Sequence, residues 1–174
     1  PALWIKLREL LQGEWSEKPH LRIWHAGCST GEEVLTMAIV LRESGFRGSV
    51  SILATDINNG FLSSAAKGLL EGKKVIEYKQ NYRQYNSAGL FEQYYHADDG
   101  ICFFNSSLLR DVKFQNHNLL TSDFEKEFDL IFCRNVMIYF DVQAKATLFQ
   151  KFYDALAPGG IFIAGSYDVI LPFE

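Results

Sequence analysis

Residues 24–35, WHAGCSTGEEVL, carry the first candidate chemistry of this 174-residue chain. The stretch reads as the end of a strand, a loop of small residues and the start of a helix, an arrangement that commonly holds a phosphate at the helix N-terminus. Here two carboxylates, Glu32 and Glu33, stand where a phosphate-binding loop has a lysine or another glycine. Because like charges repel, the loop predicts a ligand without a phosphate at this position.

Two other functions of this loop fit the sequence less well. GCSTG matches G-x-S-x-G, the nucleophile elbow of α/β-hydrolases, in which Ser29 would be the nucleophile. The elbow requires a late histidine, but the last histidine is His117 and three major predicted elements follow it. A dinucleotide loop needs G-x-G-x-x-G, whereas Gly27 and Gly31 are four residues apart with no third glycine, and a P-loop needs a lysine that is absent here.

A ligand with a ribose and a positive charge but no phosphate satisfies this loop, and S-adenosylmethionine is such a ligand. Gly27 and Gly31 would let the backbone approach it closely, and Glu33 would meet its ammonium group. Asp56, which ends the next predicted strand in LATDI, would accept hydrogen bonds from the ribose hydroxyls, as acidic residues do at that place in nucleotide-binding folds.

Composition indicates one globular domain with a full core, since 48% of the residues are hydrophobic. The net charge of −4 argues against a nucleic-acid partner, and no apolar run is long enough to be inserted in a membrane. The N-terminus lacks the pattern of a signal peptide. Cys28, Cys102 and Cys133 have no metal-ligand spacing, so we expect a cytoplasmic protein with reduced thiols and no metal site.

Segments with the hydrophobic pattern of strands alternate along the chain with segments that have the hydrophobic pattern of helices. Strands are predicted at 21–26, 49–56, 128–135 and 161–166, and helices at 3–11, 32–44, 58–70 and 142–156, with Gly45 closing the second helix and Asn58 capping the third. This order predicts an α/β fold, a mostly parallel sheet with helices on both faces. Ligands of such sheets bind at the carboxyl ends of the strands.

Residues 70–118 interrupt this alternation. The segment is polar and rich in tyrosine, with a weak helical pattern at 88–95 and two short strand patterns at 100–104 and 112–117. No Gly-, Ser- or Pro-rich linker separates it from the rest of the chain. We therefore expect an insertion, or small subdomain, within one domain.

Four stretches together resemble the CheR-type chemotaxis receptor (protein-glutamate) methyltransferases: RIWHAGCSTGEE, ILATDI, FDLIFCRNVMIYFD and LAPGGIFIAGS. The resemblance extends from about residue 21 to residue 168 and is most specific in CRNVMIYFD. It implies a Rossmann-like methyltransferase fold, S-adenosyl-L-methionine as cofactor and S-adenosyl-L-homocysteine as product. It also implies transfer to glutamate side chains on cytoplasmic helices of a chemoreceptor or related signalling protein.

The predicted cofactor-binding residues combine the loop argument with this resemblance. They are Gly27, Gly31, Glu33, Asp56, Ile57, Asn118, Leu119, Arg134 and Asn135. The predicted catalytic residues are Arg134, which would grip a carboxylate, and Tyr139, which would donate a hydrogen bond to the acceptor oxygen.

The sequence also departs from the family. Residues 1–20 do not match the threonine–aromatic–Phe–Arg segment that follows the family's N-terminal helical domain, and the chain ends at LPFE, so we expect 1–174 to be a methyltransferase domain without that helical domain and without the final strands. The family's GHSE is GSYD here, at 165–168, and the arginine-rich stretch that grips receptor tails has one arginine at 98–111. A different methyl acceptor, or a cofactor-binding regulatory module without turnover, therefore stays open.

Overall fold

The computed structural model describes residues 1–168, and the predicted chain end at LPFE lies outside the described residues. Within them, no helix combines the length and apolar character needed to cross a membrane. The helices are α1 (Ala2–Gln12), α2 (Glu32–Ser44), α3 (Asn59–Ala66), α4 (Gly72–Tyr85) and α5 (Val142–Ala155), with 3₁₀ turns at Phe91–Tyr94, Ser106–Leu109 and Met137–Tyr139. The strands are β1 (His20–Ala26), β2 (Ser49–Asp56), β3 (Leu69–Glu71), β4 (Tyr95–Asp98), β5 (Ile101–Phe104), β6 (Val112–Asn116), β7 (Phe128–Cys133) and β8 (Leu156–Ala164).

Five parallel strands form the central sheet in the order β6-β2-β1-β7-β8. The strand order reverses beside β1, because the chain moves from β1 outward through β2 and then returns to place β7 on the other side of β1. Ligands of open parallel sheets bind at such a reversal, outside the carboxyl ends of the strands. The predicted α/β fold is confirmed, and the site is expected where β1, β2 and β7 end.

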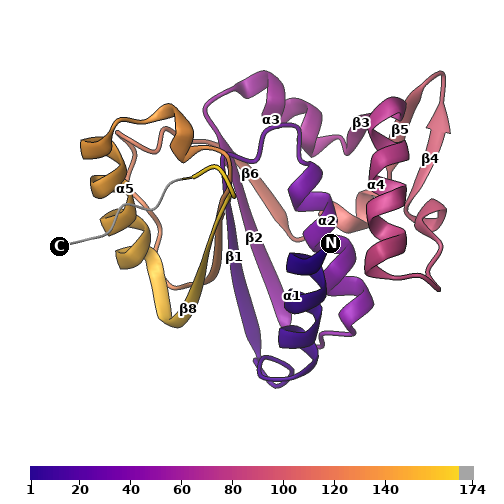
Figure 1. The fold of residues 1–174 in the computed structure, drawn as a ribbon, viewed down its shortest axis with the longest axis horizontal. Helices are drawn as coiled ribbons and strands as arrows, with labels where there is room; N and C mark the ends of the chain where they lie inside the picture. Colours follow the sequence, from indigo (N-terminus) through magenta and orange to yellow (C-terminus); the bar gives the residue numbers. More distant parts are fainter. Residues whose placement is uncertain (169–174) are drawn as a thin grey trace.

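Successive side chains of the inner strands enter two separate cores. Ile23 and Leu130 pack with α1 and α2, whereas Trp24 and Ile131 pack with α5. Figure 1 shows α1 and α2 on one side of the sheet and α5 on the other. Strands buried on both faces are mostly apolar, which explains why β7 is hydrophobic at every position except Asp129.

The insertion is smaller than the predicted 70–118. Strand β6 (112–116) pairs with β2 in the central sheet, so the prediction that it belongs to a subdomain is wrong. The predicted helix 58–70 also ends at Ala66, and Leu69 and Leu70 start the antiparallel sheet β3-β5-β4. The helix α4 (72–85), which the sequence analysis missed, completes this subdomain, which lies beyond α2 in Figure 1.

Glu43 near the end of α2 anchors the subdomain through several hydrogen bonds. Glu43 accepts hydrogen bonds from the hydroxyl groups of Tyr82 and Tyr94 and from Asn86 Nδ2. Burial, together with the hydrogen bond to Glu43, raises the pKa of Tyr94 to about 12. These contacts hold α4 beside the N-terminal half of the fold.

Candidate functional site

A cavity of about 1190 Å³ opens at the carboxyl ends of β1, β2 and β7. That volume exceeds the 300–1,000 Å³ typical of small-molecule sites. The cavity also reaches between α1, α2 and α4, where Trp4 and Tyr82 line it. Its strand-end part is lined by all but one of the predicted site residues, namely Gly27, Glu33, Asp56, Ile57, Asn118, Leu119, Arg134, Asn135 and Tyr139.

The two glycines of the loop have different roles. Gly27 has φ +82°, and a Cβ atom there would lie 2.4 Å from Val136 Cγ2, so only glycine allows the loop to pass beside the segment that follows β7. Gly31, at φ +90°, would place a Cβ atom 2.8 Å from the Cβ of Ala65 in α3. Gly31 is absent from the cavity lining, and its lack of a Cβ atom allows the close approach of α3; its contact with the cofactor stays a prediction.

The side chains of the two loop glutamates, Glu32 and Glu33, point to different partners. Glu32 receives a hydrogen bond from the hydroxyl of Thr30 and one of 2.9 Å from Lys74 Nζ in α4. Burial alone would raise the pKa of Glu32, but these two hydrogen bonds outweigh it and hold the pKa below the ordinary value. Glu32 therefore ties the loop to the subdomain.

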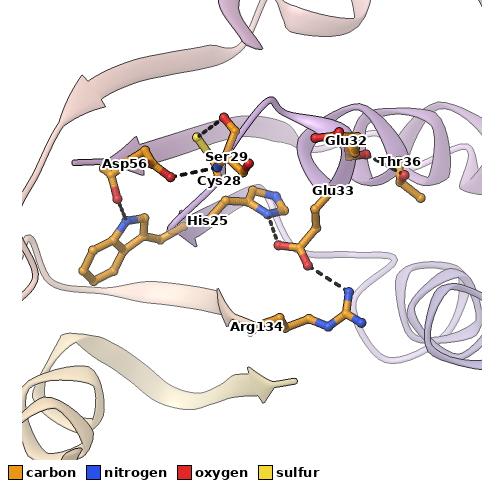
Figure 2. Close-up of polar contacts among 10 residues, drawn as sticks. His25, Cys28, Ser29, Glu32, Glu33, Thr36, Asp56 and Arg134 are labelled. Atoms are coloured by element: carbon orange, nitrogen blue, oxygen red, sulfur yellow. Dashed lines mark hydrogen bonds and ion pairs between the residues drawn. The ribbon is translucent and has the colours of Figure 1, made fainter. Parts of the chain in front are cut away.

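Glu33 points into the cavity and joins β1 to the segment after β7. His25 Nδ1 donates to Glu33 Oε1 at 2.8 Å, and Arg134 Nη1 donates to Oε2 at 2.9 Å, as Figure 2 shows. Burial opposes ionisation of Glu33, but the hydrogen bond from His25 and the charge of Arg134 together lower its pKa. Glu33 is therefore an ionised carboxylate in the cavity wall, 21% exposed.

Asp56 ends β2 on the other side of the loop (Figure 2). Its Oδ2 atom accepts from the Ser29 N–H and its Oδ1 atom accepts from the Asn58 N–H, both at 2.9 Å. These two backbone donors fix the carboxylate at the mouth of the cavity. Each oxygen keeps a further lone pair for a ligand hydroxyl.

The wall next to Asp56 is largely apolar. Ile57, 66% exposed, lines it beside Leu119, which is buried. The Asn118 side chain accepts from the Leu120 N–H at 3.0 Å and so shapes the backbone turn. Lys151 Nζ, from α5, donates to the Leu119 carbonyl oxygen at 3.1 Å and holds this segment against the sheet.

Asn135 follows β7 in the left-handed region, with φ +58°. Asp168 Oδ2 accepts hydrogen bonds of 2.7 Å from both the Asn135 N–H and the Gly165 N–H. Asp168 is buried, and its other oxygen, Oδ1, has no hydrogen-bond partner among the described residues. The sequence signalled this carboxylate only as the acid of GSYD, without its partner.

Tyr139 closes the 3₁₀ turn Met137–Tyr139 at the edge of the cavity. Its side chain is 80% exposed, and its hydroxyl has no hydrogen-bond partner within residues 1–168. An exposed hydroxyl at this edge is available to an acceptor group. As for metals, no cluster of three His, Cys, Asp or Glu side chains suited to hold an ion occurs in the described part of the chain.

Comparison with known proteins identifies the family. The model "CheR methyltransferase, SAM binding domain" matches residues 4–173. The chain belongs to the CheR methyltransferase family. The cofactor that the loop predicts, S-adenosylmethionine, is the one for which this family domain is described, and the hydrolase and dinucleotide alternatives fall away.

Named relatives of this CheR domain come from several bacteria. The Pseudomonas putida protein Cher3 is 39% identical over 152 residues, which cover 87% of this chain and 56% of Cher3. "Chemotaxis protein methyltransferase" of Listeria innocua is 35% identical over 155 residues, covering 88% and 56% of the two chains. "Chemotaxis protein methyltransferase 2" of Pseudomonas aeruginosa is 34% identical over 163 residues, covering 91% and 57%. The CheR domain thus spans just over half the length of these relatives.

Solved structures share the fold at low sequence identity. A structure described as a DhpI–SAH complex matches the CheR domain with a TM-score of 0.52 and 12% identity over 92% of this chain and 54% of that chain. The glycopeptide N-methyltransferase MtfA complexed with sinefungin matches with a TM-score of 0.51 and 10% identity over 88% and 47%. These likenesses confirm the predicted methyltransferase fold.

Proposed function

We propose that this CheR domain uses S-adenosyl-L-methionine to methylate glutamate side chains on cytoplasmic helices of a chemoreceptor or related signalling protein. One observation carries the proposal: a single cavity gathers Glu33, Asp56, Asn118, Arg134 and Tyr139 from segments that are far apart in the sequence. The family match and the relatives named as chemotaxis methyltransferases support it.

The residues of the cavity fit the cofactor. S-adenosylmethionine carries a sulfonium and an ammonium, and the wall contributes the ionised Glu33 and the carboxylate of Asp56. The cofactor has no phosphate, which agrees with the two carboxylates at the start of α2. Bound there, it supplies an electrophilic methyl group.

Each residue of the cavity has a proposed role. Asp56 accepts hydrogen bonds from the ribose hydroxyls, since both of its oxygens are already oriented by backbone N–H groups. Ile57 and Leu119 contact the adenine ring from the apolar wall, and Asn118 shapes the turn that meets its edge.

The methionine end of the cofactor lies on the other side of the loop in this proposal. Glu33 accepts from the ammonium, and the guanidinium atoms of Arg134 that Glu33 leaves free hold the carboxylate. Gly27 and Asn135 present backbone at close range, Gly27 because it has no Cβ atom and Asn135 because Asp168 fixes its φ of +58°.

Methylation of a glutamate requires alignment and no general base. A glutamate carboxylate is ionised at neutral pH, since its reference pKa is about 4.3. The domain has to hold that carboxylate in line with the methyl group in a site from which water is excluded, and such orientation contributes about 7–11 kcal/mol. Tyr139 donates its hydroxyl hydrogen to one carboxylate oxygen and leaves the other to attack.

The cytoplasm is the proposed compartment. Cys28, Cys102 and Cys133 are free and buried, and thiols are kept reduced in the cytoplasm. The acceptor glutamates of the proposal face the same compartment. Nucleic acid and membrane lipid are not proposed as partners, because the net charge of −4 offers no basic footprint.

Two measurements test the proposal. Calorimetry of this domain should give binding of S-adenosylmethionine and none of NAD. Transfer of labelled methyl groups should then be followed with the full-length protein and a chemoreceptor cytoplasmic fragment, with the acceptor glutamates replaced by alanine as control. Binding without transfer to any protein fraction would favour the regulatory module, and label on a non-glutamate acceptor would favour another methyltransferase.

A further inference from the structure

His25 is a polar ring in a position that packing alone does not explain. It lies at the end of β1 with no exposed surface, and it stacks on Phe132 with ring centroids 4.4 Å apart and planes 6° from parallel. Trp4 of α1 stacks on the same phenylalanine at 5.7 Å. An apolar side chain would fill this place without the cost of burying a polar group.

The single hydrogen bond of the ring, to Glu33, explains its presence. His25 Nδ1 lies 2.8 Å from Glu33 Oε1, and an ionised carboxylate only accepts, so Nδ1 carries the proton. The other nitrogen, Nε2, is buried without a partner in the described part of the chain. A proton on Nε2 would have no acceptor there, so the tautomer protonated on Nδ1 is the one that makes the ring's hydrogen bond.

The contact also restricts Glu33. A glutamate side chain has three rotatable bonds, and His25 and Arg134 each bind one of its two carboxylate oxygens. His25 is rigid because Phe132 and the strand enclose it, whereas the Arg134 side chain is 32% exposed. Of the two partners of the Glu33 carboxylate, His25 is therefore the one that fixes its position.

We propose that His25 is a positioning residue for the methionine end of the cofactor. It acts through Glu33, whose carboxylate it holds toward the ammonium, and it leaves the adenosine end untouched. The inference rests on the proposed function and extends it, since His25 itself does not line the cavity.

Truncation of the ligand separates positioning from general damage. S-adenosylhomocysteine has both an adenosine and an amino-acid end, whereas 5′-methylthioadenosine lacks the amino-acid end. His25→Phe keeps the ring, its bulk and the stacking but removes the donor, and His25→Asn restores a donor at the position of Nδ1. His20→Phe is the matched control, because His20 is an exposed histidine at the other end of the same strand.

Calorimetry should give a specific pattern. His25→Phe should bind S-adenosylhomocysteine about tenfold or more weakly, as expected for a loss of about 1.4 kcal/mol, and should bind 5′-methylthioadenosine within about twofold of wild type. His25→Asn should recover most of the loss, and His20→Phe should match wild type for both ligands.

Other outcomes overturn the inference. An equal loss for both ligands in His25→Phe, or no loss for either, would show that the histidine only packs. If His25→Phe does not fold, the ¹⁵N shifts of the wild-type imidazole decide, because a proton on Nε2 instead of Nδ1 contradicts the proposal. A wild-type domain that binds neither ligand would refute the proposed function itself. If the wild-type domain binds both ligands, the results above for His25→Phe and for the imidazole tautomer refute only the role of His25 and leave the proposed function intact.

Discussion

Replacement of Asp56 by alanine probes the adenosine end of the site. Its carboxylate now accepts from the Ser29 and Asn58 N–H groups, and the proposed ribose contact uses the remaining lone pairs. The variant removes the acceptor for the ribose and also for both backbone donors. Two effects are therefore expected, one on affinity and one on stability.

The magnitudes follow from the geometry. A hydrogen bond to a charged group contributes about 1.5–3 kcal/mol, so loss of the ribose contact should weaken S-adenosylmethionine binding about tenfold to 150-fold. Ser29 and Asn58 are exposed, so water replaces the lost acceptor. The free energy of unfolding of Asp56→Ala should therefore fall by only about 1 kcal/mol, the low end of the cost of leaving a donor without its partner.

The assay is calorimetric titration with S-adenosylmethionine, at a temperature where a parallel thermal melt finds the variant folded. Asp98→Ala is the control, since Asp98 is an exposed aspartate in β4, within the subdomain. Wild-type affinity in a folded Asp56→Ala variant would refute the ribose assignment. If stability alone fell, Asp56 would be a residue that orders the loop and not a ligand-binding residue.

Three further predictions concern other parts of the cavity. Tyr139→Phe should lower kcat of the full-length enzyme with cofactor affinity within about twofold, whereas a tenfold loss of affinity with kcat intact would make Tyr139 a cofactor ligand. Gly27→Ala should lower the melting temperature by about 2–12 °C, and by more than Gly45→Ala, which has a similar φ of +70° but nothing within 4 Å of its Cβ position. The lowered pKa of Glu33 means that its stabilising effect is present above the ordinary value of 4.5 and is lost as pH falls through the folded value. Denaturant titrations from about pH 6 to pH 3 should therefore show that the free energy of unfolding falls less steeply with pH in Glu33→Gln than in the wild type. An equal pH dependence in both proteins would contradict the lowered pKa of Glu33.

Periodicity predicted the elements that local sequence determines. The inner strands are apolar because both faces are buried, and Asn58 caps α3 as expected, accepting from the Gly60 and Phe61 N–H groups. Gly45 ends α2 with φ +70°, also as expected. The two helix ends depend on residues within one turn of each other.

Features that depend on distant partners were missed. β6 alternates weakly, and only its pairing with β2 identifies it as part of the central sheet. The mainly polar α4 has a short buried face, which gives a weak helical pattern. The role of its Lys74 is seen only in the structure, where Lys74 binds Glu32. The cofactor contacts were predicted partly from the loop and the end of the second strand and partly from the family motifs. They stay predictions, although the structure brings all of them except Gly31 around one cavity.

The different partners of Glu32 and Glu33 have a consequence for the order of folding. These neighbouring residues bind partners 42 and 101 positions further along the chain, in α4 and after β7. Closing long loops costs more entropy than closing short ones, so contacts of this range form after local helices. An intermediate with β1, α2 and β2 formed, but with β7 not yet docked, would leave Glu33 without Arg134. We therefore expect the cofactor site to form late in folding, so that only chains with the whole sheet assembled gain stability from the ligand.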